Sequence, residues 1–256
     1  MGRVLPILFN GDMVRAILDG RKTVTRRAVK YKYSNTEMKM RTDKYGTRPI
    51  EIQKDIEGET HGKNPDGSTW HKLLPYIEKN PPYKKGDILY VRETWAFVPC
   101  IGCSGDYIRD GGPLNCYDYQ AVEYDDGDSI SDGCFLYKAD CRKLERITWR
   151  PSIHMPKQAA RIWLKVTDVR VERLQDISEA QAAAEGAIKC YEVVRPDETK
   201  PVIYYAEDGR GYFVPGFKAI WNSTIKKPDT DRYGWDANPW VWVIEFERCG
   251  KPESEG

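Results

Sequence analysis

Runs of apolar residues that alternate with polar ones recur along the chain and predict a fold built mainly from strands. The expected strands lie within 1–9 and at 24–27, 88–95, 135–139, 160–174 and 238–246. The last of these is apolar on both faces, which is typical of a strand at the centre of a sheet. The order of strands and short helices indicates an α+β chain, a small β-barrel decorated by helices.

A short helix is predicted before the second strand. Apolar residues within 13–18 repeat at helical spacing, and Asp12 is the expected N-cap. Gly20 follows where a helix C-cap favours a residue at positive φ. The chain then enters a strand in which Thr25 and Arg27 share one side.

Two further helices are predicted later in the chain. Ser178 and Gln181 belong to a capping-box pattern that opens an alanine-rich helix ending at Glu185 and Gly186. Glu185 is poorly placed because the helix dipole disfavours a carboxylate at that end. A residue that opposes a local rule is a candidate for function. The other helix carries its apolar residues within 217–225.

Candidate chemistry is concentrated in the turn at 18–27, where four cations surround two hydroxyl groups. Repulsion from like charges lowers the pKa of Lys22 and makes it a better base, and Thr25 could then act as a nucleophile. The turn would in that case border a cleft for an anionic or carbonyl-bearing ligand. The alternative is a solvated basic turn that keeps a sheet edge soluble. The cations are Arg21, Lys22, Arg26 and Arg27.

Three stretches without clear periodicity separate the predicted elements. They run from about 31 to 82, from 99 to 133 and from 188 to 213. Loops of this length are unusual inside a compact domain and are interpreted as insertions. A chain of 256 residues can bury a sizeable core. We therefore expect a single domain, 1–256, with three insertions.

The composition is that of a globular protein, with 40% hydrophobic and 31% charged residues. The net charge of +1 excludes a uniformly basic nucleic-acid binder but leaves room for a local basic surface. Lys and Arg dominate between 21 and 48, whereas Asp and Glu dominate between 104 and 132. A basic surface and an acidic loop are therefore expected as separate features.

The seven cysteines include one pair with the spacing of a metal knuckle, Cys100 and Cys103. The second pair, Cys116 and Cys134, is too widely separated for a second knuckle, so the four residues give half of a zinc signal. A structural zinc and reduced thiols both remain open. The apolar N-terminal run is too short for a signal peptide, and no run reaches membrane-spanning length. A cytoplasmic protein that does not bind membranes is expected.

Other candidate ligand-binding residues lie outside the basic turn. Arg92 and Glu93 end an apolar strand, where they could form the rim of a cleft or pair with each other. Trp95 and Trp149 are candidates for stacking on a base, with core packing as the alternative. His154 is set among apolar residues and prolines, and is either a ligand-binding or a structural residue.

Four groups of residues in the predicted core share a pattern with one protein family. They are Ile17–Arg27, Lys85–Leu89, Ile177–Glu179 with Glu185–Gly186, and Trp242–Phe246. Together they resemble the ASCH domain of the PUA-like superfamily. Two more segments, Trp149–Pro156 and Val169–Leu174, are similar to the larger ASCH proteins encoded by phages and prophages. The resemblance covers the core and none of the three insertions.

The resemblance implies a barrel of five or six strands with a cleft for RNA or modified nucleosides. Small bacterial ASCH enzymes hydrolyse N4-acetylcytidine with a lysine, a threonine and a glutamate, which correspond here to Lys22, Thr25 and Glu185. Arg27 would correspond to a cleft arginine. This chemistry requires no cofactor.

Three alternatives to hydrolysis remain at this stage. The chain could be an RNA-binding module without catalysis, in which the cations hold phosphates and the aromatic rings hold a base. It could be a ribonuclease that works without metal and uses Lys22 and Glu185. It could also be a phage interaction protein whose acidic loop docks on a host factor.

Overall fold

The computed structural model describes most of the chain. The described residues are 2–33, 36–44, 46–53, 61–63, 65–66, 69–71, 76–99, 122–125, 127, 130–140, 147–193, 202–205 and 211–252. Two compact units are present, and each is described by itself. The first unit comprises 1–22, 86–165 and 247–256, and the second comprises 23–85 and 166–246.

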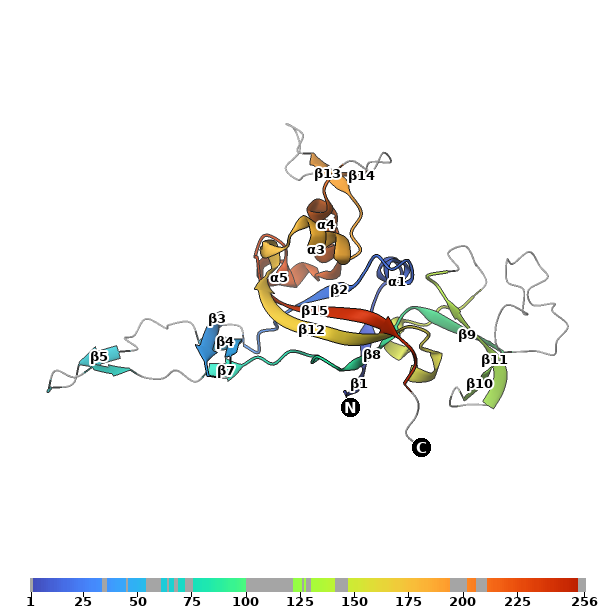
Figure 1. Cartoon of the computed structure of the whole chain (residues 1–256), viewed down its shortest axis with the longest axis horizontal. Helices are drawn as coiled ribbons and strands as arrows, with labels where there is room; N and C mark the ends of the chain where they lie inside the picture. Colours follow the sequence, from blue (N-terminus) through green and yellow to red (C-terminus); the bar gives the residue numbers. More distant parts are fainter. Residues whose placement is uncertain are drawn as a thin grey trace. The chain divides into compact units, whose positions relative to one another are not determined.

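Hydrogen-bonded strands form one five-stranded sheet in the order β1-β8-β12-β15-β2, together with smaller sheets (Figure 1). The described part of the chain is therefore a mixed α+β structure, mostly sheet with short helices. Within it the five-stranded sheet has β1 and β2 as its edges, and no closed barrel is present among these residues.

The first unit begins with β1 (Val4–Leu8), which runs parallel to β8 (Ile88–Arg92). β12 (Trp163–Arg173) starts in this unit and pairs with β8 in the antiparallel sense. A second sheet has the order β10-β11-β9. Its strands are β9 (Trp95–Pro99), β10 (Val122–Asp125) and β11 (Ile130–Tyr137). The 3-10 turns η2 (Ser152–His154) and η3 (Lys157–Ala159) follow.

Helix α1 (Gly11–Leu18) confirms the predicted first helix, but its N-cap is Asn10, not Asp12. The side-chain oxygen of Asn10 accepts a hydrogen bond from the Met13 amide at 2.9 Å. Both residue types are good N-caps, so the helix simply begins two residues earlier than the apolar pattern indicates. Gly20 has φ +73°, as its position after the helix predicts.

The second unit contains β2 (Val24–Ala28) and most of β15 (Trp240–Cys249), which pair in the antiparallel sense. Its helices are α3 (Glu179–Ala184), α4 (Phe213–Thr224) and α5 (Thr230–Tyr233), with the 3-10 turns η4 (Leu174–Asp176) and η5 (Lys227–Asp229). β15 lies between β12 and β2. The prediction of a central final strand is thereby confirmed.

All three stretches predicted as insertions contain strands, and the second holds β10 and the start of β11. The first holds β3 (Thr36–Asp43), β4 (Gly46–Gln53) and β7 (Tyr76–Glu78), which form an antiparallel sheet, and the hairpin of β5 (His61–Lys63) and β6 (Thr69–His71). The third holds the hairpin of β13 (Cys190–Val193) and β14 (Val202–Tyr205). Few residues of β3 and β4 are buried apolar ones, so these strands lack the alternation that identifies strands in a sequence.

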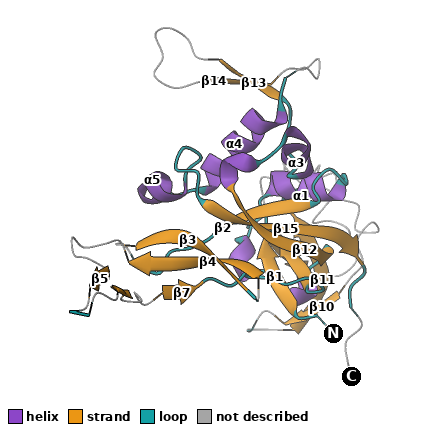
Figure 2. Ribbon diagram, turned by 60° about the vertical axis from the view of Figure 1, so that its left-hand side comes forward, coloured by secondary structure: helices purple, strands orange, loops and turns teal. Residues whose placement is uncertain are grey.

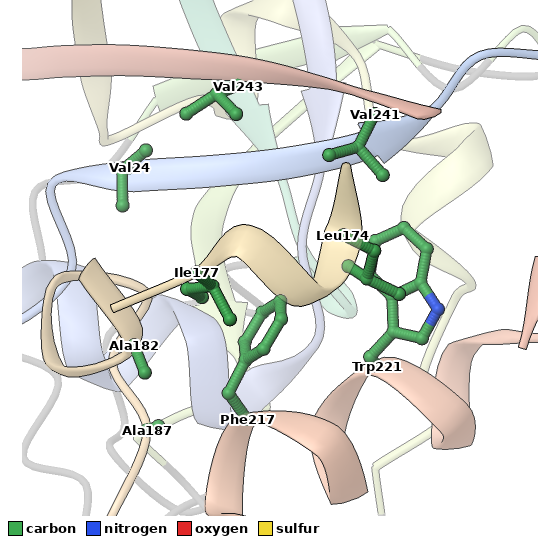
Figure 3. Close-up of a cluster of buried hydrophobic side chains, with 9 residues drawn as sticks. All are labelled: Val24, Leu174, Ile177, Ala182, Ala187, Phe217, Trp221, Val241 and Val243. Atoms are coloured by element: carbon green, nitrogen blue, oxygen red, sulfur yellow. The ribbon is translucent and has the colours of Figure 1, made fainter. Parts of the chain in front are cut away.

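The core of the second unit joins the strands to the helices. Val24 of β2 and Val243 of β15 face Phe217 and Trp221 of α4, and α3 contributes Ala182 (Figure 3). Figure 2 shows α3 and α4 on the same face of these strands. This packing determines which face of β2 lies against the helices, and β2 is the strand that carries the predicted site.

Candidate functional site

The register of β2 against β15 determines which side chains share a face. Thr25 stands opposite Ile244, and Arg27 stands opposite Trp242. Because facing residues of an antiparallel pair project to the same side, Thr25, Arg27 and Trp242 lie on one face. Arg26 lies on the other face, which α3 and α4 cover. The alternation predicted from the sequence is therefore present.

Arg26 forms a buried ion-pair cluster on the helical face of β2. Its guanidinium donates to Glu185 at 3.2 Å and to Glu172 at 3.3 Å. The side chain of Arg26 is fully buried and that of Glu185 is 4% exposed. The guanidinium also lies 5.8 Å from the centre of the Phe217 ring. Arg26 Nε is buried with no hydrogen-bond partner among the described residues.

The position of Glu185 follows from the capping of α3. Ser178 and Gln181 form the predicted capping box, and Glu185 is the C-cap. The Thr23 amide donates to the carbonyl of Ala184 at 2.8 Å. The end of α3 is thereby attached to the first residues of the second unit, directly before β2.

Lys22 is the last residue of the first unit and stands immediately before Thr23. It is 2% exposed, and its Nζ lies 5.6 Å from the centre of the Phe9 ring. Thr25 is also 2% exposed. A solvated basic turn does not describe either residue, whereas Arg21 is exposed and pairs with Asp19 at 2.9 Å.

A cavity of about 510 Å³ lies beside β2 within the second unit. Its volume falls in the range of sites for small organic ligands. Residues 26–30 line it together with 79–83 and side chains of α4 and β15. The cations at the cavity are Arg26, Arg27, Lys30 and Lys79, and the aromatic residues are Tyr83, Trp221 and Trp242.

Carboxylates hold two of the cations that line the cavity. Arg26 holds Glu185, and Lys79 pairs with the buried Glu51. Burial lowers the pKa of Arg27, while the nearby Tyr83 and Glu185 act in the opposite direction. Burial likewise raises the pKa of the Tyr83 hydroxyl, against the influence of Arg27. An anion entering the cavity would relieve the cost of keeping Arg27 charged there.

The remaining predicted ligand-binding residues lie in the first unit. Arg92 donates to the carbonyl of Ile153 at 3.1 Å and to the Tyr90 hydroxyl at 3.4 Å. The Trp95 ring is buried. It packs against aromatic neighbours, so it has no surface for stacking in this structure. Trp149 is half-buried and His154 is exposed, and neither lies at the cavity.

Glu93 accepts hydrogen bonds from Arg161, whose Nε lies 2.9 Å from its carboxylate, and not from Arg92. Burial raises the pKa of Glu93, and the hydrogen bonds from Arg161 oppose that effect. The sequence left open that Arg92 and Glu93 pair with each other, and the partner of Glu93 is Arg161 instead.

Of the four candidate zinc ligands, Cys100, Cys103 and Cys116 lie outside the described residues. Cys134 is in β11. Among the residues that the structure describes, no group of three His, Cys, Asp or Glu side chains could hold a metal ion. Within the same part of the chain, no helix is long and apolar enough to cross a membrane.

No pattern in the sequence predicts that Lys79, Asn80, Pro82 and Tyr83 line a cavity. These residues lie at the end of the first polar insertion and match no motif. A turn with an aromatic residue beside prolines, as at Pro82 and Tyr83, was the only local signal. Comparison of the chain with protein-family models, with curated proteins and with solved structures found no match.

Proposed function

We propose that the chain binds a nucleotide of RNA, or a modified nucleoside, in the cavity beside β2, and that it hydrolyses an N4-acylated cytidine at Thr25, which directly precedes the cavity residue Arg26 on that strand. The observation that carries this proposal is the cavity itself, in which cations and aromatic rings line one space. Aromatic rings suit a base and cations suit a phosphate. The resemblance to ASCH domains, with their PUA-like barrel, supports the same ligand class.

Thr25 is the proposed nucleophile. Its hydroxyl oxygen attacks the carbonyl carbon of the acyl group, while the hydroxyl proton passes to Lys22. The role of Lys22 rests on the resemblance and on its place in the sequence, three residues before Thr25. Arg27, on the same face of β2 as Thr25, stabilises the negative charge that develops on the acyl oxygen.

Glu185 is the proposed proton carrier for the leaving group. As the carbon–nitrogen bond breaks, the proton that Lys22 took from Thr25 passes by way of the Glu185 carboxylate to the amine nitrogen, and cytidine leaves. Water then attacks the acyl ester on Thr25, which releases the carboxylic acid and restores the hydroxyl. Arg26, fully buried beside Glu185, holds that carboxylate in place.

The test is incubation of the purified chain with N4-acetylcytidine and chromatographic measurement of cytidine and acetate. We expect turnover by the wild type and a loss of roughly 10³-fold or more for Thr25→Ala. Lys22→Ala should be similarly impaired, and Thr25→Ser should retain part of the activity because it keeps a hydroxyl.

Thr23→Ala is the matched control, because Thr23 is an exposed threonine two residues away. It should retain activity within about twofold. Absence of turnover by the wild type would contradict the hydrolase proposal. Equal activity of the Thr25→Ala and wild-type proteins would contradict the assignment of the nucleophile.

The Arg26–Glu185 ion pair favours a second function, RNA binding without hydrolysis. A carboxylate already engaged by a buried guanidinium is less available for proton transfer. Under this function the protein binds RNA with a measurable salt dependence and leaves N4-acetylcytidine intact. The turnover assay and a binding assay on one preparation distinguish the two functions.

A further inference from the structure

We propose that the ligand is a single-stranded RNA chain, whose nucleotides next to the one in the cavity lie on a surface formed by 30–33 and Arg232. We call this the flanking surface. The inference rests on the proposed function, since it takes the cavity to hold one nucleotide. It states that the ligand is an RNA chain, whereas the cavity alone would also accept a free nucleoside.

The flanking surface interleaves cations with aromatic rings in the sequence Lys30, Tyr31, Lys32, Tyr33. Both lysines are exposed, and Tyr33 is 54% exposed. Proteins that bind single strands use cations along the backbone and aromatic rings on which unpaired bases stack. An exposed tyrosine next to an exposed lysine provides both.

Contacts with α5 hold this segment in one conformation. The Tyr31 amide donates to the Tyr233 hydroxyl at 3.0 Å, and Lys30 Nζ lies 4.0 Å from the centre of the Tyr233 ring. Arg232 donates to the carbonyl of Tyr33 at 3.3 Å, and its guanidinium lies 4.2 Å from the centre of the Tyr31 ring. A segment ordered before binding loses less conformational entropy when it binds.

The flanking surface is continuous with the cavity. Lys30 lines the cavity. The buried carboxylate of Glu51 accepts the amides of Lys32 at 2.7 Å and Tyr33 at 2.8 Å. The same carboxylate pairs with Lys79, which also lines the cavity. One buried carboxylate, that of Glu51, therefore connects the flanking surface to a second residue of the cavity lining, Lys79.

The charge of this surface is mixed. Asp231 is exposed beside Arg232, so repulsion of phosphates by an acid accompanies attraction by the cations. Stacking on Tyr33 should therefore contribute more to affinity than the charges do. This distinguishes a single strand, whose bases are accessible, from a duplex, whose bases are not.

The test compares three probes by fluorescence anisotropy or by competition. They are cytidine 5′-monophosphate, a heptaribonucleotide with a central cytidine, and the same strand annealed to its complement. We expect the single strand to bind at least about tenfold more tightly than the monophosphate and the duplex. Tyr33→Ala should weaken binding of the single strand by roughly 5- to 100-fold and binding of the monophosphate by less than about twofold.

Tyr212→Ala is the matched control for Tyr33→Ala, because Tyr212 is 62% exposed in the same unit. It should leave all three affinities unchanged. Lys32→Ala should reduce the dependence of log affinity on log salt by about 0.7 for the single strand. Lys138→Ala, which removes an exposed lysine of the first unit, should not.

Equal affinity for the strand and the monophosphate would overturn the polymer inference and leave the proposed function standing. Equal effects of Tyr33→Ala and Tyr212→Ala would overturn the flanking surface. A strand that binds through Tyr33 without turnover of N4-acetylcytidine would support the flanking surface and contradict the hydrolase.

Discussion

At the residue scale, two buried carboxylates of the second unit each form an ion pair with a cation. Glu185 engages Arg26, and Glu51 engages Lys79. Glu51 also accepts the Thr36 hydroxyl at 2.5 Å. Arg26 and Lys79 line the cavity, whereas Glu185 and Glu51 do not. The positions of these two cations therefore depend on carboxylates that lie behind the cavity lining.

Glu51 should make stability depend on pH. Burial opposes its ionisation, but the hydrogen bonds from Lys79, Thr36 and two amides outweigh burial and lower the pKa from 4.5 to about 2. A folded-state pKa below the unfolded value gives stability that is present above about pH 4.5 and is lost as the pH falls toward 2. Between pH 6 and pH 3 the expected loss is about 2 kcal/mol.

The measurement is the free energy of unfolding in urea across this pH range, for the wild type and for Glu51→Gln. The variant should be less stable at pH 6 and should lack this part of the pH dependence. Glu37→Gln, at a half-exposed glutamate of β3, is the control and should follow the wild type. A wild-type curve parallel to that of Glu51→Gln would contradict the role of Glu51.

At the scale of elements, the end of α1 prepares the entry into β2. Gly20 has φ +73°, and an added Cβ there would meet nothing within 4 Å. A left-handed backbone costs a residue with a Cβ about 1 kcal/mol. Gly20→Ala should therefore destabilise the protein by about 1 kcal/mol through backbone conformation alone.

Gly250→Ala is the control for this prediction. A Cβ at Gly250 also meets nothing within 4 Å, and its φ is not in the left-handed region. Thermal or urea unfolding of both variants checks the difference. Similar stabilities of the two variants would mean that the turn relaxes and that positive φ is not required there.

The elements around the site differ in how far the sequence predicts them. The sequence predicts the capping box at Ser178, a helix end at Glu185 and the strand through Thr25, because each depends on residues close together in sequence. The strands β3 and β4 were not, because their buried positions include the carboxylate of Glu51 instead of a regular apolar series.

At the scale of the whole molecule, the net charge of +1 limits the electrostatic part of any RNA affinity. Only the local cations can contribute, and the four nearest the proposed path are Arg27, Lys30, Lys32 and Arg232. Each phosphate contact of a single strand contributes about −0.7 to the salt slope. The slope of log affinity against log salt should therefore lie between about −1 and −3.

Titration of the heptaribonucleotide between low and moderate salt measures this slope. A slope steeper than about −5 would require more phosphate contacts than these residues supply, and would locate binding elsewhere on the chain. A slope near zero would leave stacking as the sole contribution and contradict a role for the cations.

The sequence by itself determined the local parts of this protein: the helix before Gly20, the alternation along β2, the capped helix that ends at Glu185 and the apolar strand β15. These features depend on spacing and on the conformational preferences of single residues. The tertiary structure decided which side chains meet. Arg26 and Glu185 are far apart in sequence, and the residues at 79–83 reach the cavity only because the strands before them fold into a sheet. Such contacts depend on packing between distant segments, which no local pattern encodes.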